Sequence, residues 1–489
     1  MLVQKNFKYN KAPAPPYSYI ISMNGKRKIP FSWRMIGRGL PCGAQVYTQS
    51  DLEFAHASND RTGAYVAVIG VALDLATNTS SNSTVPEKLL GALVHGEEMF
   101  LRALDYLAGR HVIVYREGLG IPPKIVNDAC AMLKVNYNAE NHLISSNFHL
   151  IEVLDEGASL RPEFVHERKL WQTGALGNLS PLEHTKILTP NHILNTKTFR
   201  TLRFYPRDTL PTTDNISDLA DEFILLARAQ ASMLGSRRRL VRGLTAGMDS
   251  RASLALIRNQ NDVFFTYYTR PVERADALIA GQIADRLSLD HFILASEEQF
   301  DATVALGGTS KVIPVSIDKK LVRRVKAWSW YKHRASLISA YAQSLLPNIP
   351  GKTLHIRSNL NEIGRAFWGK NGPCHERGDV LPRAKPLWHK FAKDHFTRFF
   401  DETEFTAEKL YGYDMLDMFY WEHRCGTWIS EVLQETDFAF DTHAFINCRR
   451  MLEISLSAPF LSRRAGSLFT EIFKRGAPEL SDIPINPRL

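Results

Sequence analysis

An apolar run that breaks into small residues and then into a helical pattern constrains the fold of this chain more than any other stretch. Residues 239–244 suit a buried strand, and the small residues 245–247 let the backbone turn sharply and approach a ligand closely. Asp249 and Ser250 then stand where a helix would be capped. This order brings backbone N–H groups and the positive end of a helix dipole together, a geometry that binds phosphate. An ordinary buried turn between a strand and a helix is the alternative interpretation.

The segments that follow predict a doubly wound parallel sheet. Residues 262–269 form a continuous β-prone run, which is typical of a strand buried on both faces. An apolar stripe at helical spacing follows from about Arg274, and residues 290–294 predict a third strand. Alternating strands and helices imply right-handed crossovers in an α/β fold. Ligands bind such sheets beyond the carboxyl ends of the strands, where residues 245–250 (the 245–250 loop) are expected to lie.

The 245–250 loop, Thr-Ala-Gly-Met-Asp-Ser, resembles the Ser-Gly-Gly-x-Asp-Ser loop of the N-type ATP pyrophosphatases, most closely the branch of asparagine synthetases and β-lactam synthetases. Thr stands for Ser and Ala for the first Gly, and both residues remain small. Asp276 and His291 also match an acidic residue and a histidine that follow in this family. The resemblance implies an adenine nucleotide α-hydrolase-like domain with a helical tail over residues 206–489, and beyond about residue 385 the chain is expected to be mostly helical.

A second segment, residues 354–365, resembles the Ser-Gly-x-Gly-x-Asp-Glu segment with which the family contacts the nucleotide and a metal ion. A short β-prone run breaks into polar residues before a predicted helix. Asn361 stands where the family has Asp, Glu362 matches the Glu, and the glycines are absent. The alternative is that Glu362 and Arg365 form a pair on the surface of a helix, which would stabilise it little.

The resemblance assigns roles to individual residues of this sequence. Arg464 lies near the position of a Lys-rich helix start in the family and would stabilise charge on pyrophosphate, although a surface arginine at a helix end is an equal alternative. The residues expected to bind ATP are Leu244, Thr245, Ala246, Gly247, Met248, Asp249, Ser250, Tyr267 and Ser358. The residues expected to act in catalysis are Ser250, Glu362 and Arg464, and those expected to hold Mg²⁺ are Asp249 and Asn361.

Residues 1–205 resemble the class II glutaminase domain of asparagine synthetases, which implies an N-terminal-nucleophile (Ntn) hydrolase-like αββα sandwich. Strands are predicted at residues 65–74 and 111–115, with a helix at residues 85–107 between them. The family's nucleophile is a Cys directly after the initiator Met, whereas Leu2 follows Met1 here and the first cysteine is Cys42. Leucine cannot attack an amide, so we expect a degenerate domain without glutaminase activity.

Composition narrows the class of protein. At 489 residues and 44% hydrophobic content, the chain can bury two substantial cores. The five cysteines are scattered without a Cys-x-x-Cys pair, which favours reduced thiols. No apolar run reaches the roughly 18 residues of a membrane span. A cytoplasmic enzyme with no membrane partner is therefore the expectation, and a homodimer is compatible with it.

The net charge of +9 raises the question of a polyanionic partner. Basic residues alternate with aromatic ones over residues 319–334, as in some nucleic-acid-binding segments. On a helix, however, Leu321, Val322, Val325 and Trp328 would form a buried face and the cations a solvated one, and we favour this interpretation.

The expected function is an ATP-dependent, AMP-forming carbon–nitrogen ligase. A substrate carboxylate would attack the α-phosphorus of ATP, pyrophosphate would leave, and an amine would take the acyl group. Because glutaminase activity is not expected, the amine would be ammonia, an amino substrate or a group of the same molecule. The alternatives are an ATP pyrophosphatase that modifies tRNA or nucleobases and a non-catalytic nucleotide-binding protein.

Overall fold

The computed structural model describes residues 14–25, 28–29, 33–35, 43–49, 52–79, 84–155, 157–166, 171, 174–257, 259, 261–304, 308–330, 334–384 and 392–487. Met1, Leu2 and Cys42, on which the glutaminase prediction depends, lie outside the described residues. The four cysteines that are described are buried and free.

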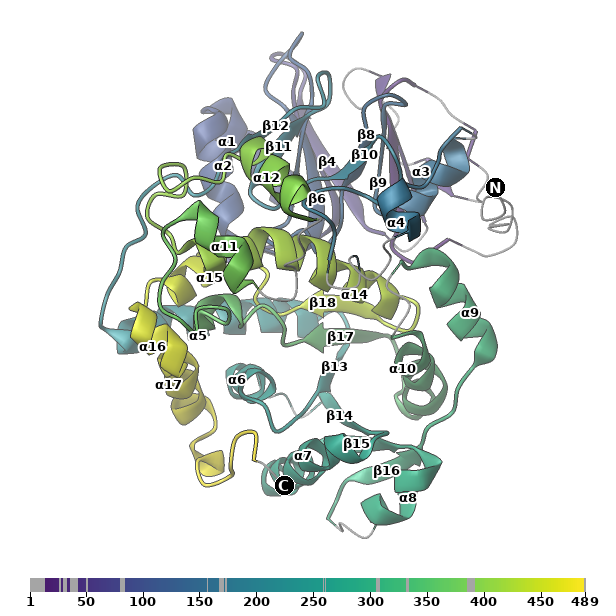
Figure 1. Ribbon diagram of the computed structural model, residues 1–489, viewed down its shortest axis with the longest axis vertical. Coiled ribbons are helices and arrows are strands. Elements are labelled where there is room, and N and C mark those ends of the chain that lie inside the picture. The colour runs from purple at the N-terminus through teal and green to yellow at the C-terminus, as the bar shows by residue number, and fades with distance from the viewer. Residues whose placement is uncertain are drawn as a thin grey trace.

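The first half of the chain forms two six-stranded antiparallel sheets (Figure 1). The first sheet has the order β10-β8-β9-β1-β3-β2, and the second has the order β12-β11-β7-β6-β5-β4. The strands of the first sheet are β1 (Tyr19–Ser22), β2 (Arg34–Met35), β3 (Gln45–Thr48), β8 (Asn136–Asn138), β9 (Leu143–Ser145) and β10 (Thr185–Ile187). Those of the second are β4 (Phe54–Asn59), β5 (Ala64–Asp74), β6 (Leu107–Arg116), β7 (Lys124–Asn127), β11 (His192–Asn195) and β12 (Thr201–Arg203).

The two sheets pack face to face with helices outside them, in four layers. Alternate residues of β5 point to opposite faces. Ala67 and Ile69 join the core between the sheets, whereas Val66 and Val68 pack toward α1 (Thr84–Val94) and α2 (Glu97–Ala103). On the far side, Ile20 of the first sheet packs with residues of α3 (Phe148–Leu154), which α4 (Pro162–His166) follows. The predicted strands are confirmed, but the single helix predicted at residues 85–107 is wrong.

That helix is interrupted because Gly96 adopts a φ of 127°, outside the helical region. The α2 helix then starts anew at Glu97, and a 3₁₀ turn, Leu104–Tyr106, ends it before β6.

The second half contains a six-stranded parallel sheet with the order β16-β15-β14-β13-β17-β18. Its strands are β13 (Arg239–Gly243), β14 (Val263–Tyr268), β15 (Asp290–Ala295), β16 (Lys311–Pro314), β17 (Thr353–Arg357) and β18 (Asp441–Ala444). The helices of this part are α5 (Ile216–Gly235), α6 (Met248–Leu256), α7 (Arg274–Leu287), α8 (Glu297–Val304), α9 (Lys319–Trp328) and α10 (Ala335–Ala340). The predicted run of strand, helix, strand, helix, strand is confirmed, and the chain is of mixed α/β class. The chain adds strands β14 to β16 on one side of β13 and strands β17 and β18 on the other. The boundary between β13 and β17 is therefore the topological switch point of the sheet.

The remaining described part is mostly helical, as expected. Its helices are α11 (Arg377–Arg383), α12 (Lys393–Glu402), α13 (Met415–Phe419), the π-helical segment Tyr420–Ile429, α14 (Ser430–Thr436), α15 (Arg449–Leu456), α16 (Phe460–Ala465) and α17 (Ser467–Gly476). On α9, Val325 and Trp328 are buried while Lys319, Lys320 and Arg323 are exposed. The amphipathic interpretation is therefore confirmed for residues 319–328 of the basic segment, whereas residues 331–333 lie outside the described residues. No helix among the described residues combines the length and the apolar character needed to cross a membrane.

Buried polar contacts join the two halves. The Lys134 ammonium pairs with Glu431 at 2.5 Å, and the indole N–H of Trp421 donates to the Ala129 carbonyl at 2.7 Å. One apolar cluster also runs from the second antiparallel sheet into the C-terminal helices. Edge strand β18 of the parallel sheet lies next to the sandwich (Figure 1).

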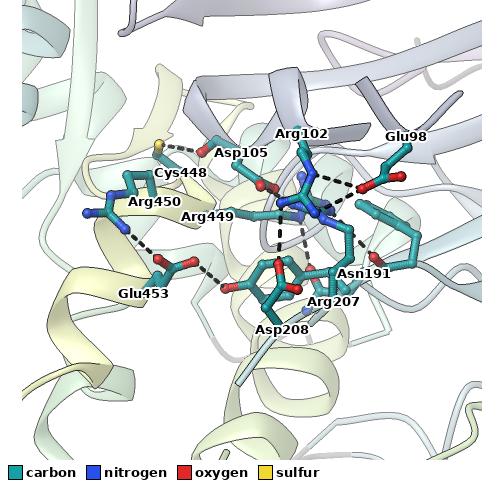
Figure 2. A network of polar contacts seen from close by, with 12 residues as sticks. Glu98, Arg102, Asp105, Asn191, Arg207, Asp208, Cys448, Arg449, Arg450 and Glu453 are labelled. Carbon is teal, nitrogen blue, oxygen red and sulfur yellow. Dashed lines mark hydrogen bonds and ion pairs between the residues drawn. The ribbon is translucent and has the colours of Figure 1, made fainter. Parts of the chain in front are cut away.

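Figure 2 shows another part of this interface, where residues after β12 and in α15 meet the turn that follows α2. Arg207 pairs with Asp105, and the Cys448 thiol donates to the Asp105 carbonyl at 3.2 Å. Arg449 donates from Nε to Asn191 Oδ1 at 3.0 Å. The two halves therefore share buried charges as well as apolar surface.

Candidate active site

A cavity of about 620 Å³ opens at the switch point of the parallel sheet, beyond the carboxyl ends of β13, β14 and β17. Its lining combines the strand ends, the 245–250 loop, the segment after β17 and the start of α10. The lining residues are Gly243, Leu244, Thr245, Asp249, Ser250, Phe265, Thr266, Tyr267, Thr269, Arg270, Glu273, Arg334, Leu337, Tyr341, His355, Ile356, Arg357, Ser358, Asn359 and Glu362. Both motifs that the sequence analysis singled out therefore face one cavity.

The 245–250 loop is held by its own side chains and by α7. The Thr245 N–H donates to Ser250 Oγ at 3.1 Å, and the two hydroxyls are 2.9 Å apart. The Gly247 N–H donates to Thr245 Oγ1 at 3.2 Å, and the Ala246 N–H donates to Asp276 Oδ1 at 2.8 Å. The residue that matches the family's acidic position on the second helix thus supports the turn. The Ser250 hydroxyl is engaged inside the loop, so contact with a phosphate would require it to rotate.

The N-terminus of α6 follows this loop and carries no side-chain cap. Gly247 occupies the cap position with an extended backbone. The first-turn N–H groups of an α-helix have no intrahelical acceptor, so they are available to an anion. The capping predicted for Asp249 and Ser250 is wrong, because both residues lie inside the first turn of the helix.

A C-terminal segment clamps the outer side of the loop. The Asn486 N–H donates to the Ala246 carbonyl at 3.0 Å. The Arg251 guanidinium donates to the carbonyls of Ile483, at 2.8 Å, and Pro484, at 2.5 Å. Arg251 is fully buried by this segment. The loop is therefore held on one side by Asp276 of α7 and on another by residues 483–486, which lie more than two hundred positions later in the chain.

Asp249 of the loop and Glu362 of the segment after β17 form a pair of neighbouring carboxylates. Asp249 Oδ2 accepts from Arg365 at 2.8 Å, while its buried Oδ1 has no hydrogen-bond partner among the described residues. Burial, together with the charge of Glu362, raises the pKa of Asp249 to about 7. The Asn361 carboxamide donates to the Asp249 carbonyl at a long 3.5 Å. The surface pair of Glu362 with Arg365 is not formed, because Arg365 turns to Asp249.

The segment after β17 is strained at Leu360. Leu360 adopts a φ of 90°, a left-handed conformation that costs a non-glycine residue energy. Its side chain is fully buried, and its N–H donates to Glu362 Oε2 at 2.9 Å. The predicted helix here is wrong, because one 3₁₀ turn, Ile363–Arg365, follows instead. The buried leucine and the bond to Glu362 hold the carboxylate in place despite the missing glycines.

The opposite wall of the cavity is aromatic and basic. Tyr267 lies 4.9 Å from Tyr341 between ring centroids, and its hydroxyl donates to the Leu337 carbonyl at 3.1 Å. Phe265 contacts Tyr341 edge to face at 5.0 Å. Arg334 and Arg357 also line this wall. It offers a stacking surface for a planar group together with positive charge.

The predicted site residues fall into two groups. Those that line the cavity are Leu244, Thr245, Asp249, Ser250, Tyr267, Ser358 and Glu362. Those that do not line it are Ala246, Gly247, Met248, Asn361 and Arg464. The N–H and the carbonyl of Leu244 are both bonded within the sheet, to the Phe265 carbonyl and to Thr266 Oγ1, so its backbone is poorly placed to read an adenine base.

Arg464 and Asn361 depart most from the expectation. Arg464 is exposed and donates to the Ala366 carbonyl at 3.2 Å, away from the cavity lining. Asn361 is buried beneath Asp249. The cations that do face the cavity are Arg270, Arg334 and Arg357, and none of the three was among the predicted site residues. The signal for Arg357 was available, since it directly follows the buried strand residues of β17.

Asp249 and Glu362 could hold Mg²⁺. The unpartnered oxygen of Asp249 and the neighbouring carboxylate of Glu362 suit a cation that binds through one or two carboxylates, water and phosphate oxygens. No group of three or more His, Cys, Asp or Glu side chains in the described part of the chain forms a metal centre by itself. The other ligands would therefore come from nucleotide and water.

In the comparisons with known proteins, neither a family model nor a curated protein matches the chain.

Proposed function

We propose that this protein is an ATP-dependent, AMP-forming carbon–nitrogen ligase of the asparagine synthetase type. The observation that carries the proposal is the cavity at the switch point, where an uncapped helix N-terminus and a pair of carboxylates face an aromatic wall. The helix N-terminus suits phosphates, the carboxylates suit Mg²⁺, and the aromatic wall suits a base. Bound Mg²⁺ would neutralise charge on the phosphates.

In the proposed reaction, ATP and a small-molecule carboxylate meet in this cavity. The carboxylate attacks the α-phosphorus, pyrophosphate leaves, and the acyl group passes from AMP to an amine. The protein contributes positioning and charge stabilisation. Thr245, Ser250 and the first N–H groups of α6 hold pyrophosphate, Asp249 and Glu362 hold Mg²⁺, and Tyr267 lies beside the base.

The finer fold assignments belong to the same proposal. We propose that residues 1–205 form a degenerate Ntn-type domain and residues 206–489 an adenine nucleotide α-hydrolase-like domain. The four-layer packing of the first half and the strand order of the parallel sheet support these assignments. We also propose a cytoplasmic location, on the basis of the reduced cysteines.

The test is the identity of the nucleotide product. Purified protein is incubated with ATP, Mg²⁺ and panels of carboxylates and amines, and hydroxylamine traps acyl-adenylate as a hydroxamate. We expect AMP and pyrophosphate, and ADP as the main product would refute the proposal. ATP binding without any turnover would instead favour the non-catalytic alternative, and turnover only with tRNA would favour the nucleic-acid-modifying one.

Asp249→Asn links this activity to the cavity. The substitution keeps the shape of the side chain and removes a charge that would face Mg²⁺. We expect it to weaken ATP·Mg²⁺ binding or transition-state stabilisation by at least about 2 kcal/mol. Asp221→Asn, on an exposed carboxylate paired with Arg475, is the control and should behave as the wild type. Equal ATP affinity and equal turnover in the two variants would show that this cavity is not the ATP site.

A further inference from the structure

A second cavity, of about 400 Å³, opens at one end of the antiparallel sandwich. Its lining includes Met23 after β1, Arg116 and residues 120–123 from the connection between β6 and β7, His142 before β9, and Lys197 after β11. The strands β1 and β9 belong to the first antiparallel sheet, whereas β6, β7 and β11 belong to the second. The cavity therefore opens where the two sheets end side by side.

This cavity lies far from the switch point of the parallel sheet. Strand β6 begins at Leu107, directly after the turn in which Asp105 pairs with Arg207 at the interface with the second half (Figure 2). The same strand ends at Arg116, which lines the cavity. Ten residues of extended chain span roughly 30 Å. The two cavities also have no lining residue in common, so a ligand here would be separate from one at the switch point.

Backbone bonds hold the rim of the cavity in place. The Met23 N–H donates to the His142 carbonyl at 3.0 Å, which ties the end of β1 to the start of β9. Thr196 donates from its N–H, at 3.1 Å, and from its hydroxyl, at 2.7 Å, to the Pro123 carbonyl. Pro122 and Pro123 further restrict the backbone of their segment. The cavity is thus formed by the fold itself, as is usual for sites that bind small molecules.

The ionisable side chains that line this cavity are all basic. They are Arg116, His142 and Lys197, and no Asp or Glu lines it in the part of the chain that the structure describes. Arg116 donates from Nε to a backbone carbonyl at 2.9 Å, which orients its guanidinium group without neutralising it. Glu117, the next residue, instead pairs with Lys124 at 2.5 Å. The positive charge at the cavity is therefore left for an anion.

Apolar groups lie beside the basic ones. Met23 packs against the hydrophobic core between the two sheets, and Ile121 also lines the cavity. The His142 ring contacts Phe199 edge to face, with the ring centroids 5.4 Å apart. The His142 backbone has a φ of 53°, a left-handed conformation that costs a non-glycine residue energy. The ring is therefore held at the border between the apolar and the basic part of the cavity.

The size and the charge of the cavity together indicate the class of ligand. A volume of about 400 Å³ falls in the range of sites for small organic molecules. A phosphate monoester carries about −1.5 to −2 charge at neutral pH and three strong acceptor oxygens. Arginine, lysine and histidine side chains supply matching charge-assisted donors. A monocarboxylate has a single charge and would leave more of the positive charge uncompensated.

We infer that this cavity binds a small organic phosphate, with the phosphate group at Arg116, His142 and Lys197 and the organic group against Met23 and Ile121. The inference does not rest on the proposed function, because the cavity lies in the other half of the chain and its test uses no nucleotide.

Labelling with pyridoxal 5′-phosphate provides the test, and pyridoxal, which lacks the phosphate, is the matched probe. The aldehyde of either probe condenses with a lysine amine and releases water, and borohydride reduces the imine to a stable secondary amine. Peptide mass spectrometry of the full-length protein then quantifies the label at each lysine. In the labelled complex Arg116 and His142 hold the phosphate while Lys197 meets the aldehyde. Lys409, an exposed lysine that does not line the cavity, is the internal reference.

We expect the ratio of labelling by pyridoxal 5′-phosphate to labelling by pyridoxal to be at least threefold higher at Lys197 than at Lys409. Excess phenyl phosphate should abolish this preference, whereas benzoate at the same concentration should leave it. A preference below threefold overturns the inference. Equal competition by benzoate identifies a general anion site and overturns the assignment of phosphate.

Two variants separate binding from folding and from local charge. Arg116→Gln should reduce the preference at Lys197 to the level at Lys409. Arg200→Gln is the control, because it removes the same charge from an exposed arginine that follows Lys197 closely but does not line the cavity, and it should keep the preference.

Circular dichroism checks that both variants fold. If Arg116→Gln does not fold, His142→Asn replaces it, because asparagine tolerates the left-handed backbone and removes the imidazole. An unchanged preference at Lys197 in the folded variant contradicts the inference.

Discussion

At the scale of single residues, Asp249 carries the most information. One oxygen of its carboxylate forms a salt bridge with Arg365, while the other is buried and has no hydrogen-bond partner in the part of the chain that the structure describes. Glu362 adds negative charge nearby. The charged form of such a carboxylate is unfavourable in the free protein, and a bound cation would stabilise it. Acidic residues with a perturbed pKa are common at functional sites, where the residue serves ligand binding or catalysis rather than the stability of the fold.

The raised pKa of Asp249 predicts a defined dependence of stability on pH. The carboxyl has a pKa of about 7 in the folded protein and about 3.9 in an unfolded chain. The folded state therefore binds this proton more tightly, and the contribution of Asp249 to the free energy of unfolding falls as the pH rises from about 4 to about 7. Asp249→Asn removes this dependence.

We expect the variant to gain about 1–3 kcal/mol over the wild type at pH 8 and to lose that advantage as the pH approaches 4. Urea unfolding of both proteins at several pH values measures the difference, in which the other titrating groups cancel. A difference that stays constant with pH would mean that Asp249 titrates normally.

At the scale of elements, the close packing of α6 on α17 positions the end of α6 that we propose to bind phosphate. A Cβ atom at Gly476 would lie 2.1 Å from the Ala255 carbonyl oxygen, so the two helices touch through a glycine. Because that neighbour is backbone, it cannot move without displacing α6. The position of the α6 N-terminus in the cavity therefore depends on a residue at the end of another helix.

Gly476→Ala is expected to destabilise the protein by at least about 2 kcal/mol and to weaken ATP binding as well, because overpacking forces the helices apart. Gly235→Ala is the matched control, since Gly235 ends α5 with open space around it and alanine has the higher helix propensity. The control should equal the wild type or exceed it in stability. Chemical unfolding and nucleotide titration measure both effects, and equal behaviour of the two variants would exclude the packing argument.

Sequence patterns predicted the positions of the helices and strands better than the tertiary contacts between their side chains. The strands and helices from β13 to β15 follow apolar periodicity and turn residues, which are local properties. The break at Gly96 was missed because an isolated glycine in a helical pattern is often tolerated. Arg357, which forms no ion pair with a described residue, was also missed, because an arginine at the end of a strand does not disclose which charges the fold will bring near it. The resemblance of two separate motifs predicted Asp249 and Asn361 as the metal ligands, whereas in the structure Glu362 is the carboxylate whose charge acts on Asp249.

At the scale of the whole molecule, buried ion pairs connect the sandwich to the helices of the second half. Arg203 at the end of β12 binds Glu422 through both of its terminal nitrogens, at 2.5 and 2.8 Å, and both side chains are buried. Removing one partner of such a pair leaves the other charge buried and uncompensated. The two halves should therefore unfold together.

Arg203→Met is expected to lower the free energy of unfolding by about 3–5 kcal/mol, because Glu422 loses its charge partner. The double variant Arg203→Met, Glu422→Gln should recover part of that loss, since it leaves no charge behind. Calorimetry of the three proteins measures this, and we expect a single transition in each. A double variant less stable than Arg203→Met, or separate transitions for the two halves, would contradict the coupling.

The clamp on the 245–250 loop has a consequence for the order in which this protein is completed during synthesis. The bond from Arg251 to the Ile483 carbonyl spans 232 residues. The turn between β13 and α6 can form as soon as its own residues leave the ribosome, because its internal bonds are local. Its outer support must wait until Ile483 and Asn486 emerge, long after the sandwich and most of the parallel sheet have been made. A nascent chain therefore carries the turn without its outer support, and the proposed binding of nucleotide is expected only after residues 483–486 have packed against the loop.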